Sequence, residues 1–227
     1  MDVNIRLAVL DRIYAIYDDF VKDLDVACRK HCSHCCTCNV TLTSLEGYKI
    51  ARHLLDGGQF HLLEKLQSEL SRKRFQPQVT INMLAEYCMQ AKDLPEETSD
   101  PAWGSCPLLK DDECPFYRDR PFGCRCMLSK QNCQEIGLAE MDSLVLTVNN
   151  VILQYIEHID ARGFSGNLTD ILVFMASPEN RRQYRMNHLP SPPAKLIANR
   201  PLKVLMIPPE HRAELQPILN ALQSIRL

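Results

Sequence analysis

The sequence predicts a mainly α-helical protein, a single helical domain with a long cysteine-rich irregular loop organised around a metal centre. Apolar residues recur every three or four positions over several stretches, which is typical of amphipathic helices. Residues 93–136 combine prolines, alternating charges and cysteines without a sustained period, so they cannot pack by themselves. We expect one domain over 1–227, with a cysteine-cluster core at 28–133 and C-terminal helices with a proline-rich wrapping tail at 137–227.

Four helices are expected in the first half of the chain. The first is amphipathic and leads into a cysteine-rich segment, and a short β-branched stretch, NVTLT, follows as extended chain. Thr43 and Glu46 then form a capping box, and the helix that this box begins should end at Gly57. The expected helices cover residues 3–27, 43–57, 63–70 and 81–91.

The second half of the sequence predicts a long central helix and a tail that wraps the surface. Residues 138–159 are apolar on much of the helix circumference, so we expect this helix to lie in the core. Asn167 can cap a shorter helix that runs through Phe174. From residue 190 onward the chain is rich in proline and should wrap the surface as extended chain before a last helix at 209–225.

Charge and composition argue against several classes of function. The net charge is -2, with 26 basic and 28 acidic residues mixed along the chain, so no basic face can neutralise a run of phosphates and we expect no nucleic-acid partner. The N-terminus carries acids among its apolar residues, unlike a secretory signal, and no stretch approaches the roughly 20 apolar residues that span a bilayer. We expect a cytoplasmic protein with no membrane partner. Ordinary hydrolase or nucleotide chemistry is not expected, because the sequence has no Ser/His/Asp set, glycine-rich phosphate loop or His-Glu-x-x-His element.

The eleven cysteines are more typical of metal ligands than of disulfides. Their number is odd, and their share of the chain lies below the roughly 8 to 10% that marks disulfide scaffolds. A reducing compartment also keeps thiols free. Cys88 stands alone on the apolar side of a predicted helix, with Leu84 and Ala91, and is expected to be a small core residue. The other cysteines form two clumps, Cys28, Cys32, Cys35, Cys36 and Cys38, and Cys106, Cys114, Cys124, Cys126 and Cys133.

The spacing within these clumps suits a thiolate centre built from two chain segments. Cys32 and Cys35 are separated by two residues, a tight turn that aims two sulfurs at one point. Cys106, Cys114 and Cys124 are more widely spaced, like the loop-borne ligands of an iron-sulfur site. Because neither clump alone supplies both the ligands and the compensating charge, we expect the two clumps to meet in space.

Adjacent cysteines favour more than one metal atom. Cys35 and Cys36 side by side suit a cluster with several metals, or two nearby sites. A single tetrahedral zinc needs four ligands and would leave most of the clumped cysteines idle. Cys28, Cys32 and Cys35 also share the spacing of radical S-adenosylmethionine enzymes, but the sequence around them lacks the alternating strands and helices of that α/β barrel.

Two runs, CRKHCSHCCTCNVTLTSLEGYKIARHLL and CPLLKDDECPFYRDRPFGCR, resemble the YkgJ-type cysteine-cluster family. That family is described as a zinc- or iron-chelating domain and also includes flagellin N-methylases. The spacer between Cys28 and Cys32 is one residue longer than in the family's usual pattern, and an alternative register uses Cys32, Cys35 and Cys38. The positions that carry the resemblance are Cys28, Cys32, Cys35, Cys36, Val40, Leu42, Thr43, Glu46, Cys106, Leu109, Cys114, Tyr117, Arg120, Pro121, Cys124 and Arg125.

Three functional hypotheses follow. The first is a metal-chelating protein that binds an iron-sulfur centre and has a redox, sensing or metal-handling role. The second is an interaction module with structural zinc and a protein partner. The third, which the resemblance implies, is a protein-lysine methylase that uses S-adenosylmethionine.

We assign eight metal ligands and no catalytic residue. His31 and His34 are expected to lie beside the centre or in solvent, because interleaved histidines more often support a site than bind its metal. Arg118, Arg120 and Arg125 would offset the negative charge of the thiolates, or simply be solvated. The predicted ligands of the iron-sulfur cluster or zinc are Cys28, Cys32, Cys35, Cys36, Cys106, Cys114, Cys124 and Cys126.

Overall fold

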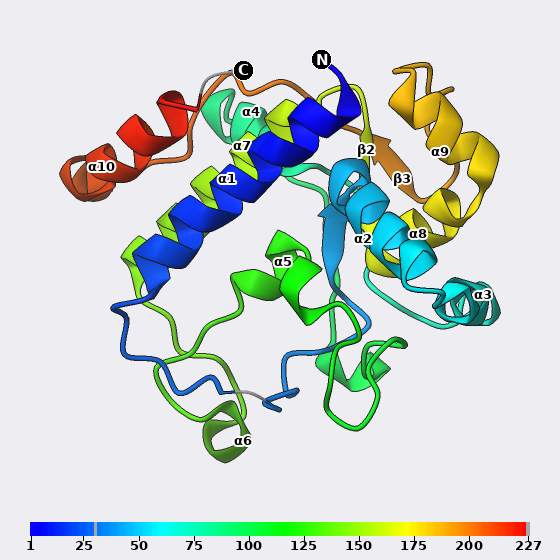
Figure 1. Cartoon of the computed structure of the whole chain (residues 1–227). Coiled ribbons are helices and arrows are strands. Elements are labelled where there is room, and N and C mark those ends of the chain that lie inside the picture. The colour runs from blue at the N-terminus through cyan, green and yellow to red at the C-terminus, as the bar shows by residue number, and fades with distance from the viewer. Residues whose placement is uncertain (30, 226–227) are drawn as a thin grey trace.

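The computed structural model describes residues 1–29 and 31–225 and confirms the mainly α prediction (Figure 1). The longer helices are α1 Val3–Val21, α2 Ser44–Asp56, α3 Phe60–Ser68, α4 Ile81–Met89, α7 Ser143–Ile159, α8 Leu168–Ala176, α9 Pro178–Arg185 and α10 Arg212–Gln223. Shorter helical pieces are η1 Pro101–Trp103, η2 Tyr117–Asp119, α5 Phe122–Arg125, α6 Cys133–Ile136 and η3 Pro209–His211. In the part of the chain that is described, no helix is both long enough and apolar enough to cross a membrane.

A small antiparallel sheet joins segments that are far apart in the sequence. It has the order β1-β2-β3, with β1 Thr41–Thr43, β2 Phe164–Asn167 and β3 Leu196–Ala198. The NVTLT stretch, expected to be extended, supplies β1, and β3 lies in the proline-rich tail that was also expected to be extended, whereas β2 is not predicted by the sequence. Strands of three or four residues show too few alternations to reveal a period of two, so their pairing is decided by tertiary contacts.

Helix α1 ends at Val21, whereas the sequence predicted a helix over 3–27. The last turn of α1 contains no basic residue, and Asp18, Asp19 and Asp23 lie at or just beyond its end. Acidic groups near a helix C-terminus face the negative end of the macrodipole, which disfavours further turns. The chain therefore leaves the helix early and reaches the first cysteine clump as irregular backbone.

Helix α7 begins at Ser143, later than the predicted start at residue 138. Glu140, which precedes this helix, pairs instead with the segment between Cys126 and Cys133. The Lys130 N–H donates to the Glu140 carbonyl at 2.9 Å, and the Glu140 N–H donates to the Ser129 hydroxyl at 2.9 Å. These backbone groups are therefore not available to a helix.

Both predicted helix caps are confirmed. The Thr43 side chain accepts from the Glu46 N–H while the Glu46 side chain accepts from the Thr43 N–H, which is the capping box expected at the start of α2. Asn167 accepts from the Thr169 N–H at the start of α8. Because Asn167 also ends β2, one residue stops the strand and starts the helix.

The helices pack in pairs around the sheet. Figure 1 shows α1 lying along α7, with α2 and α8 together on the other side of the molecule, and inter-residue contacts join both pairs. Leu10, Ile13, Leu45, Ile152 and Ile171 are fully buried where these helices meet. The irregular segments that carry the cysteines lie below α5 in this view, outside the helical layers.

Asp160, at the end of α7, is a fully buried acid that holds several elements together. Its carboxyl oxygens accept hydrogen bonds from Arg6, Ser44, the Leu45 N–H, Tyr184 and Asn199. Burial raises the pKa of this carboxyl from 3.8 to about 6, although the donors around it act in the opposite direction.

This raised pKa predicts a pH-dependent stability. Between pH 3.8 and about 6 the folded state binds the proton of Asp160 more tightly than the unfolded state does, so stability present below this range is lost as the pH rises through it. We expect the wild-type protein to lose roughly 3 kcal/mol relative to Asp160→Asn over this interval, at about 1.36 kcal/mol for each pH unit. Urea unfolding of both proteins at pH 4, 5, 6 and 7 measures the difference. If the stability difference between the two proteins does not change with pH, the raised pKa of Asp160 is contradicted.

Cys88 corrects the expectation that it is a core residue: its side chain is exposed. The buried face of α4 consists of Asn82, Ala85 and Glu86, of which two are polar. Asn82 hydrogen-bonds the Gln154 carbonyl at 3.2 Å, and Glu86 pairs with Arg200 at 3.0 Å. A buried polar network thus turns the apolar side of α4 outward, which hydrophobic periodicity alone cannot reveal.

Cys88→Ser is therefore expected to change the free energy of unfolding by less than about 0.5 kcal/mol, as exposed substitutions usually do. The sequence alone had implied a loss on the order of 1 to 3 kcal/mol from burying a hydroxyl. The melting temperature and the metal content per chain should both match those of the wild-type protein. A clear drop in melting temperature would show that this side chain is buried after all.

Candidate metal centre

One cavity of about 200 Å³ collects thiols from both cysteine clumps. Its walls come from the segment after α1, the irregular stretch before α5, and α5 itself. The prediction that the two clumps meet in space is therefore confirmed. The cysteines that line the cavity are Cys28, Cys32, Cys35, Cys36, Cys106, Cys114 and Cys124.

Backbone hydrogen bonds bring the two clumps together. Thr37 and Ser105 form an isolated antiparallel bridge. On one side of it the Cys106 N–H donates to the Cys36 carbonyl at 2.8 Å, and on the other the Cys38 N–H donates to the Gly104 carbonyl at 2.9 Å. Because two polypeptide segments exchange backbone bonds at this point, Cys36 and Cys106 are placed side by side by the main chain rather than by their thiols.

A second backbone contact closes the far end of the cysteine segment. The Ala27 N–H donates to the Ser129 carbonyl at 2.8 Å, and the Cys28 sulfur lies 4.0 Å from the Met127 carbonyl oxygen. The segment that begins with Cys28 is therefore tied to the chain beyond α5. The first clump is therefore held at one end by Gly104 and Cys106 and at the other by Met127 and Ser129.

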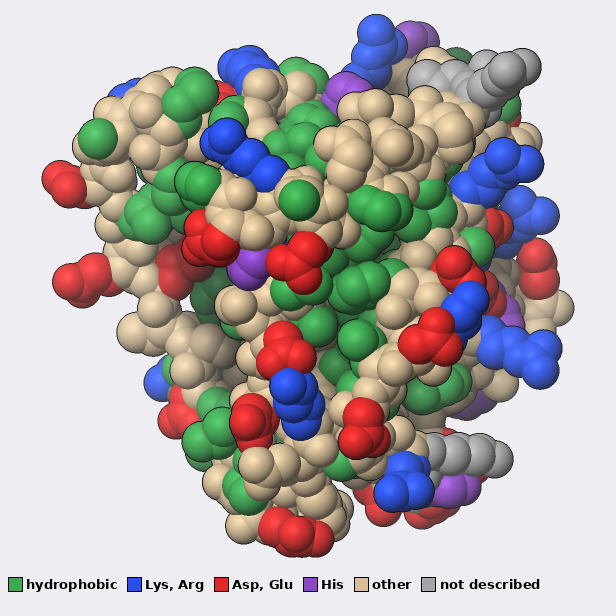
Figure 2. Space-filling view, turned by 90° about the vertical axis from the view of Figure 1, so that its left-hand side faces the viewer, with side chains coloured by type: hydrophobic (Ala, Val, Ile, Leu, Met, Phe, Trp, Pro, Cys, Tyr) green, Lys and Arg blue, Asp and Glu red, His purple; other side chains and the backbone are tan. Residues whose placement is uncertain are grey.

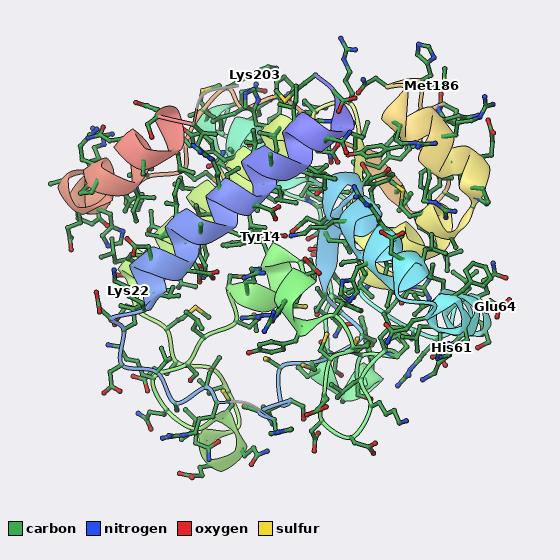
Figure 3. The ribbon with its side chains drawn as sticks, in the orientation of Figure 1. Tyr14, Lys22, His61, Glu64, Met186 and Lys203 are labelled. Atoms are coloured by element: carbon green, nitrogen blue, oxygen red, sulfur yellow. The ribbon has the colours of Figure 1, made fainter. Side chains whose placement is uncertain are left out.

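Glu46 positions α5, the short helix that carries Cys124. One carboxyl oxygen of Glu46 accepts from the Tyr14 hydroxyl at 2.8 Å and from the Phe122 N–H at 2.7 Å. The other accepts from the Thr43 N–H at 2.8 Å and its hydroxyl at 3.0 Å. Figure 3 shows Tyr14 between α1 and α5. A single buried carboxyl group thus fixes α1, the start of α2 and the first residue of α5 relative to one another.

Gly123 lets α5 approach the sheet closely. A Cβ atom at this position would lie 2.7 Å from the backbone carbonyl oxygen of Thr41 in β1, closer than real Cβ atoms come to other atoms. The contact places Cys124, the next residue, directly beside the sheet edge and facing the cavity. A larger residue at position 123 would push this cysteine away.

Burial favours the protonated form of four of the cavity thiols. Burial is the main cause that raises the pKa of Cys124, Cys106 and Cys28, and it raises that of Cys114 to about 11. Neighbouring thiols in the same cavity add to this effect on Cys124, Cys106 first among them. A bound metal would have to displace these protons, as it does in other thiolate sites.

Cys35 and Cys36 behave differently from each other. Their thiols hydrogen-bond one another, which is the largest cause of a raised pKa at Cys35 and of a lowered pKa at Cys36. Cys36 also lies within electrostatic range of Cys124, Cys106 and Cys114. The adjacent pair singled out in the sequence therefore points its two sulfurs into the same region.

Three arginines supply positive charge beside the sulfurs. Arg120, Arg125 and the exposed Arg29 all line the cavity, so two of the three arginines considered in the sequence lie beside the thiols. The Arg125 guanidinium is buried, lies 4.3 Å from the centroid of the Tyr14 ring and pairs with Asp18 at 3.3 Å. Arg120 lies 4.0 Å from the Tyr117 ring centroid at the exposed side of the cavity. Arg118 is exposed and does not line the cavity.

Three cysteines of the clumps lie outside the cavity lining. Cys126, predicted as a ligand, is buried and has its sulfur 3.7 Å from the Gly123 carbonyl oxygen. Cys38 lies 3.7 Å from the Lys73 carbonyl oxygen, and Cys133 is buried near Gln131. Burial, as the first cause, raises the pKa of Cys126 to about 12. These three thiols contact backbone rather than the cavity.

The two interleaved histidines are exposed. His31 lies 3.5 Å from Glu113 and lines a neighbouring cavity of about 260 Å³, which shares Cys32, Cys36 and Cys114 with the first. His34 lines neither cavity. This placement agrees with the expectation that they lie beside the centre or in solvent.

Sequence reasoning missed the apolar part of the cavity wall. Leu108, Phe116 and Leu128 line it and are buried or partly buried in the hydrophobic core. Leu108 stands in the CPLL stretch and Phe116 in CPFY, so an apolar residue two positions after a cysteine is the signal that could have identified both. The thiols therefore face a space whose wall is partly hydrocarbon, which lowers the local dielectric and strengthens charge interactions within it.

The donor set fits a metal that prefers soft ligands. Seven cysteines and three arginines line one cavity, which matches the ligands and the charge compensation that a zinc or iron-sulfur centre requires. Among residues 1–29 and 31–225, no three His, Cys, Asp or Glu side chains are already close enough together to hold one ion. Metal binding would therefore include an adjustment of thiol side chains.

Comparison with protein-family models, with curated proteins and with solved structures finds no match for this chain. The resemblance to the YkgJ-type family rests on the two cysteine motifs. In the structure these motifs share one cavity, and the non-cysteine positions Glu46, Tyr117, Arg120 and Arg125 lie in it or support it.

Proposed function

We propose that this protein is a metal-chelating cysteine-cluster protein that binds an iron-sulfur centre in the thiol-lined cavity. The observation that carries the proposal is the convergence of seven of the eight predicted ligands on one cavity. When bound, such a centre supplies one-electron redox chemistry or a redox-sensitive state, which suits an electron-transfer, sensing or metal-handling role. The ligands would be drawn from Cys28, Cys32, Cys35, Cys36, Cys106, Cys114 and Cys124.

The size of the cavity supports a cluster over a single zinc ion. Its volume is about 200 Å³. One buried water occupies only roughly 10 to 15 Å³ of such space, so the cavity has room for several atoms. A tetrahedral zinc takes four ligands, fewer than the thiols that line the wall.

The environment of the thiols supports a cytoplasmic location. All eleven cysteines lie in described residues, and each is free. Thiols this numerous and close persist in a reducing compartment. Figure 2 shows acidic and basic side chains interspersed on the face that carries α10, which supports our proposal that nucleic acid is not a partner.

Anaerobic purification followed by metal and acid-labile sulfide analysis tests the proposal. We expect brown protein with iron and sulfide in comparable amounts and visible absorbance that bleaches on reduction. Air strips clusters and lets zinc replace iron, so an aerobic preparation serves as the comparison. Colourless anaerobic protein with stoichiometric zinc would favour the structural zinc module instead, and protein without either metal would overturn both.

Metal removal should loosen the cysteine loop selectively. Residues 93–136 contain only short helical pieces, and the bound metal would cross-link them to the first clump. We expect trypsin to cleave after Lys110 and Arg118 several times faster in chelator-treated protein, while far-ultraviolet circular dichroism keeps the helical signal. Equal cleavage rates with and without metal would contradict a centre that orders this loop.

A further inference from the structure

A second cavity, of about 420 Å³, lies between the N-terminal end of α1, α2 and α9. These three elements meet at the upper right of Figure 1, and none of the residues that line this cavity lines the thiol cavity. We call it the arginine pocket after Arg52, Arg181 and Arg185, which form much of its wall. Nothing in the proposed metal chemistry uses these residues.

Positive charge in the arginine pocket exceeds negative charge. Asp56 is the acid in its lining, and it already pairs with Arg52 at 3.5 Å. Within the described part of the chain, neither Arg181 nor Arg185 pairs with a carboxylate. Two guanidinium groups therefore face the pocket without a counter-ion from the protein.

Helix α9 places these two guanidinium groups on one face. Arg181 and Arg185 are four residues apart, so they lie one turn apart and repel each other. The intervening Arg182 points elsewhere and pairs with Glu179 at 2.9 Å. Glu179 therefore neutralises Arg182 on the outer face of the helix, whereas Arg181 and Arg185 keep their charge on the pocket face.

Arg181 is held in place by the main chain. Its Nη1 atom donates to the Met175 carbonyl at 2.6 Å and to the Ala176 carbonyl at 2.8 Å. Burial, and to a lesser degree Arg185, lowers the pKa of Arg181, which reflects a cation kept in a partly desolvated place beside a like charge. A guanidinium fixed in this way loses little side-chain freedom when it binds an anion.

We propose that the arginine pocket binds a small phosphate-bearing molecule. The planar guanidinium groups of Arg181 and Arg185 suit the oxygens of one phosphate group. The negative charge of a phosphate is about equal to the positive charge of these two side chains. Tyr48, which is buried, and Asn4 complete the wall, and the volume of about 420 Å³ has room for a small molecule. The site is independent of the metal centre.

Isothermal titration of the full-length, metal-loaded protein with pyrophosphate tests this proposal. Arg185→Gln removes one guanidinium fork, and among residues 1–29 and 31–225 this side chain makes no hydrogen bond or ion pair that holds the fold together. The variant should therefore weaken binding roughly tenfold or more without unfolding the protein. Arg182→Gln is the matched control, since it changes the same residue type on the same helix outside the pocket. Arg181→Lys keeps the charge but loses the fork and should also weaken binding.

Retained binding in the wild-type protein and Arg182→Gln, with weakened binding in Arg185→Gln, supports the site. The proposal is overturned if the wild-type protein does not bind pyrophosphate, if Arg185→Gln binds it equally well, or if Arg182→Gln weakens it as much, because general charge attraction then explains the result. Melting curves of all variants exclude misfolding as a cause. None of these outcomes depends on which metal occupies the thiol cavity.

Discussion

Cys124→Ser is expected to remove most of the bound metal. Cys124 lies in the short helix α5. Contacts of Glu46 and Gly123 fix α5 against α2 and β1, so the position of this cysteine is well defined. Serine offers a hard, mostly protonated hydroxyl where a soft metal prefers a thiolate. Loss of an outer partner of a metal ligand already weakens metal binding by roughly 10- to 100-fold, so loss of a ligand should do at least as much.

The measurement is iron, zinc and sulfide per chain in protein purified without oxygen. Cys88→Ser provides the control, since it is the same substitution at an exposed thiol outside the cavity. We expect the control to retain full metal and Cys124→Ser to retain little. Full occupancy in Cys124→Ser, or metal loss in Cys88→Ser with the fold intact, would show that the ligands are assigned wrongly.

Cys126→Ser extends this test to the predicted ligand that the cavity does not include. Its thiol is buried against the Gly123 carbonyl, so the serine hydroxyl can make the same hydrogen bond. If Cys126 is not a ligand, metal content should stay at the wild-type level. Metal loss would mean that the cavity rearranges enough on binding to admit this residue.

The sequence predicts the helical fold well where local signals decide the structure. The capping box of Thr43 and Glu46 and the cap at Asn167 appear as expected, since both depend on side chains within three residues of the backbone that they satisfy. Helix ends set by distant contacts are less predictable. The delayed start of α7 depends on Glu140 pairing with Ser129 and Lys130, which no local pattern encodes.

In the candidate site, too, the features set by local sequence are predictable and those set by distant contacts are not. Cysteine spacing predicts which thiols cluster, because turns such as that between Cys32 and Cys35 are local. It does not reveal that Cys36 and Cys106 are joined through the main chain, or that Cys126 turns away from the cavity. Hydrophobic periodicity predicts Cys88 in the core, but the polar contacts of Asn82 and Glu86 bury the opposite face of α4 and leave Cys88 exposed.

The capping box describes only part of the role of Glu46. The capping box accounts for one carboxyl oxygen, whereas the other accepts from Tyr14 and from the Phe122 N–H. Burial, and then Glu46 itself, raises the pKa of Tyr14, so its hydroxyl keeps the proton that it donates. All four groups around Glu46 are therefore donors, and the site requires two acceptor oxygens.

Glu46→Gln is expected to lower both stability and metal content. Glutamine replaces one acceptor oxygen with an amide that donates, so at least one buried N–H is left facing another donor. An unsatisfied buried group costs about 1 to 3 kcal/mol, which lowers the melting temperature by roughly 2 to 12 °C in a chain of this size. Because Phe122 begins the helix that carries Cys124, we also expect the cysteine to shift and the cavity to bind its metal more weakly.

Glu64→Gln and Tyr14→Phe separate these effects. Glu64 is exposed on α3, away from Tyr14 in Figure 3, so its amide variant should match the wild-type protein in melting temperature and metal content. Tyr14→Phe removes one donor but leaves the Phe122 N–H bonded to Glu46, so it should lower stability with little loss of metal.

If Glu46→Gln keeps full metal while its melting temperature falls, the carboxyl group caps α2 but does not position Cys124. Equal metal loss in Tyr14→Phe would point instead to general destabilisation of the loop.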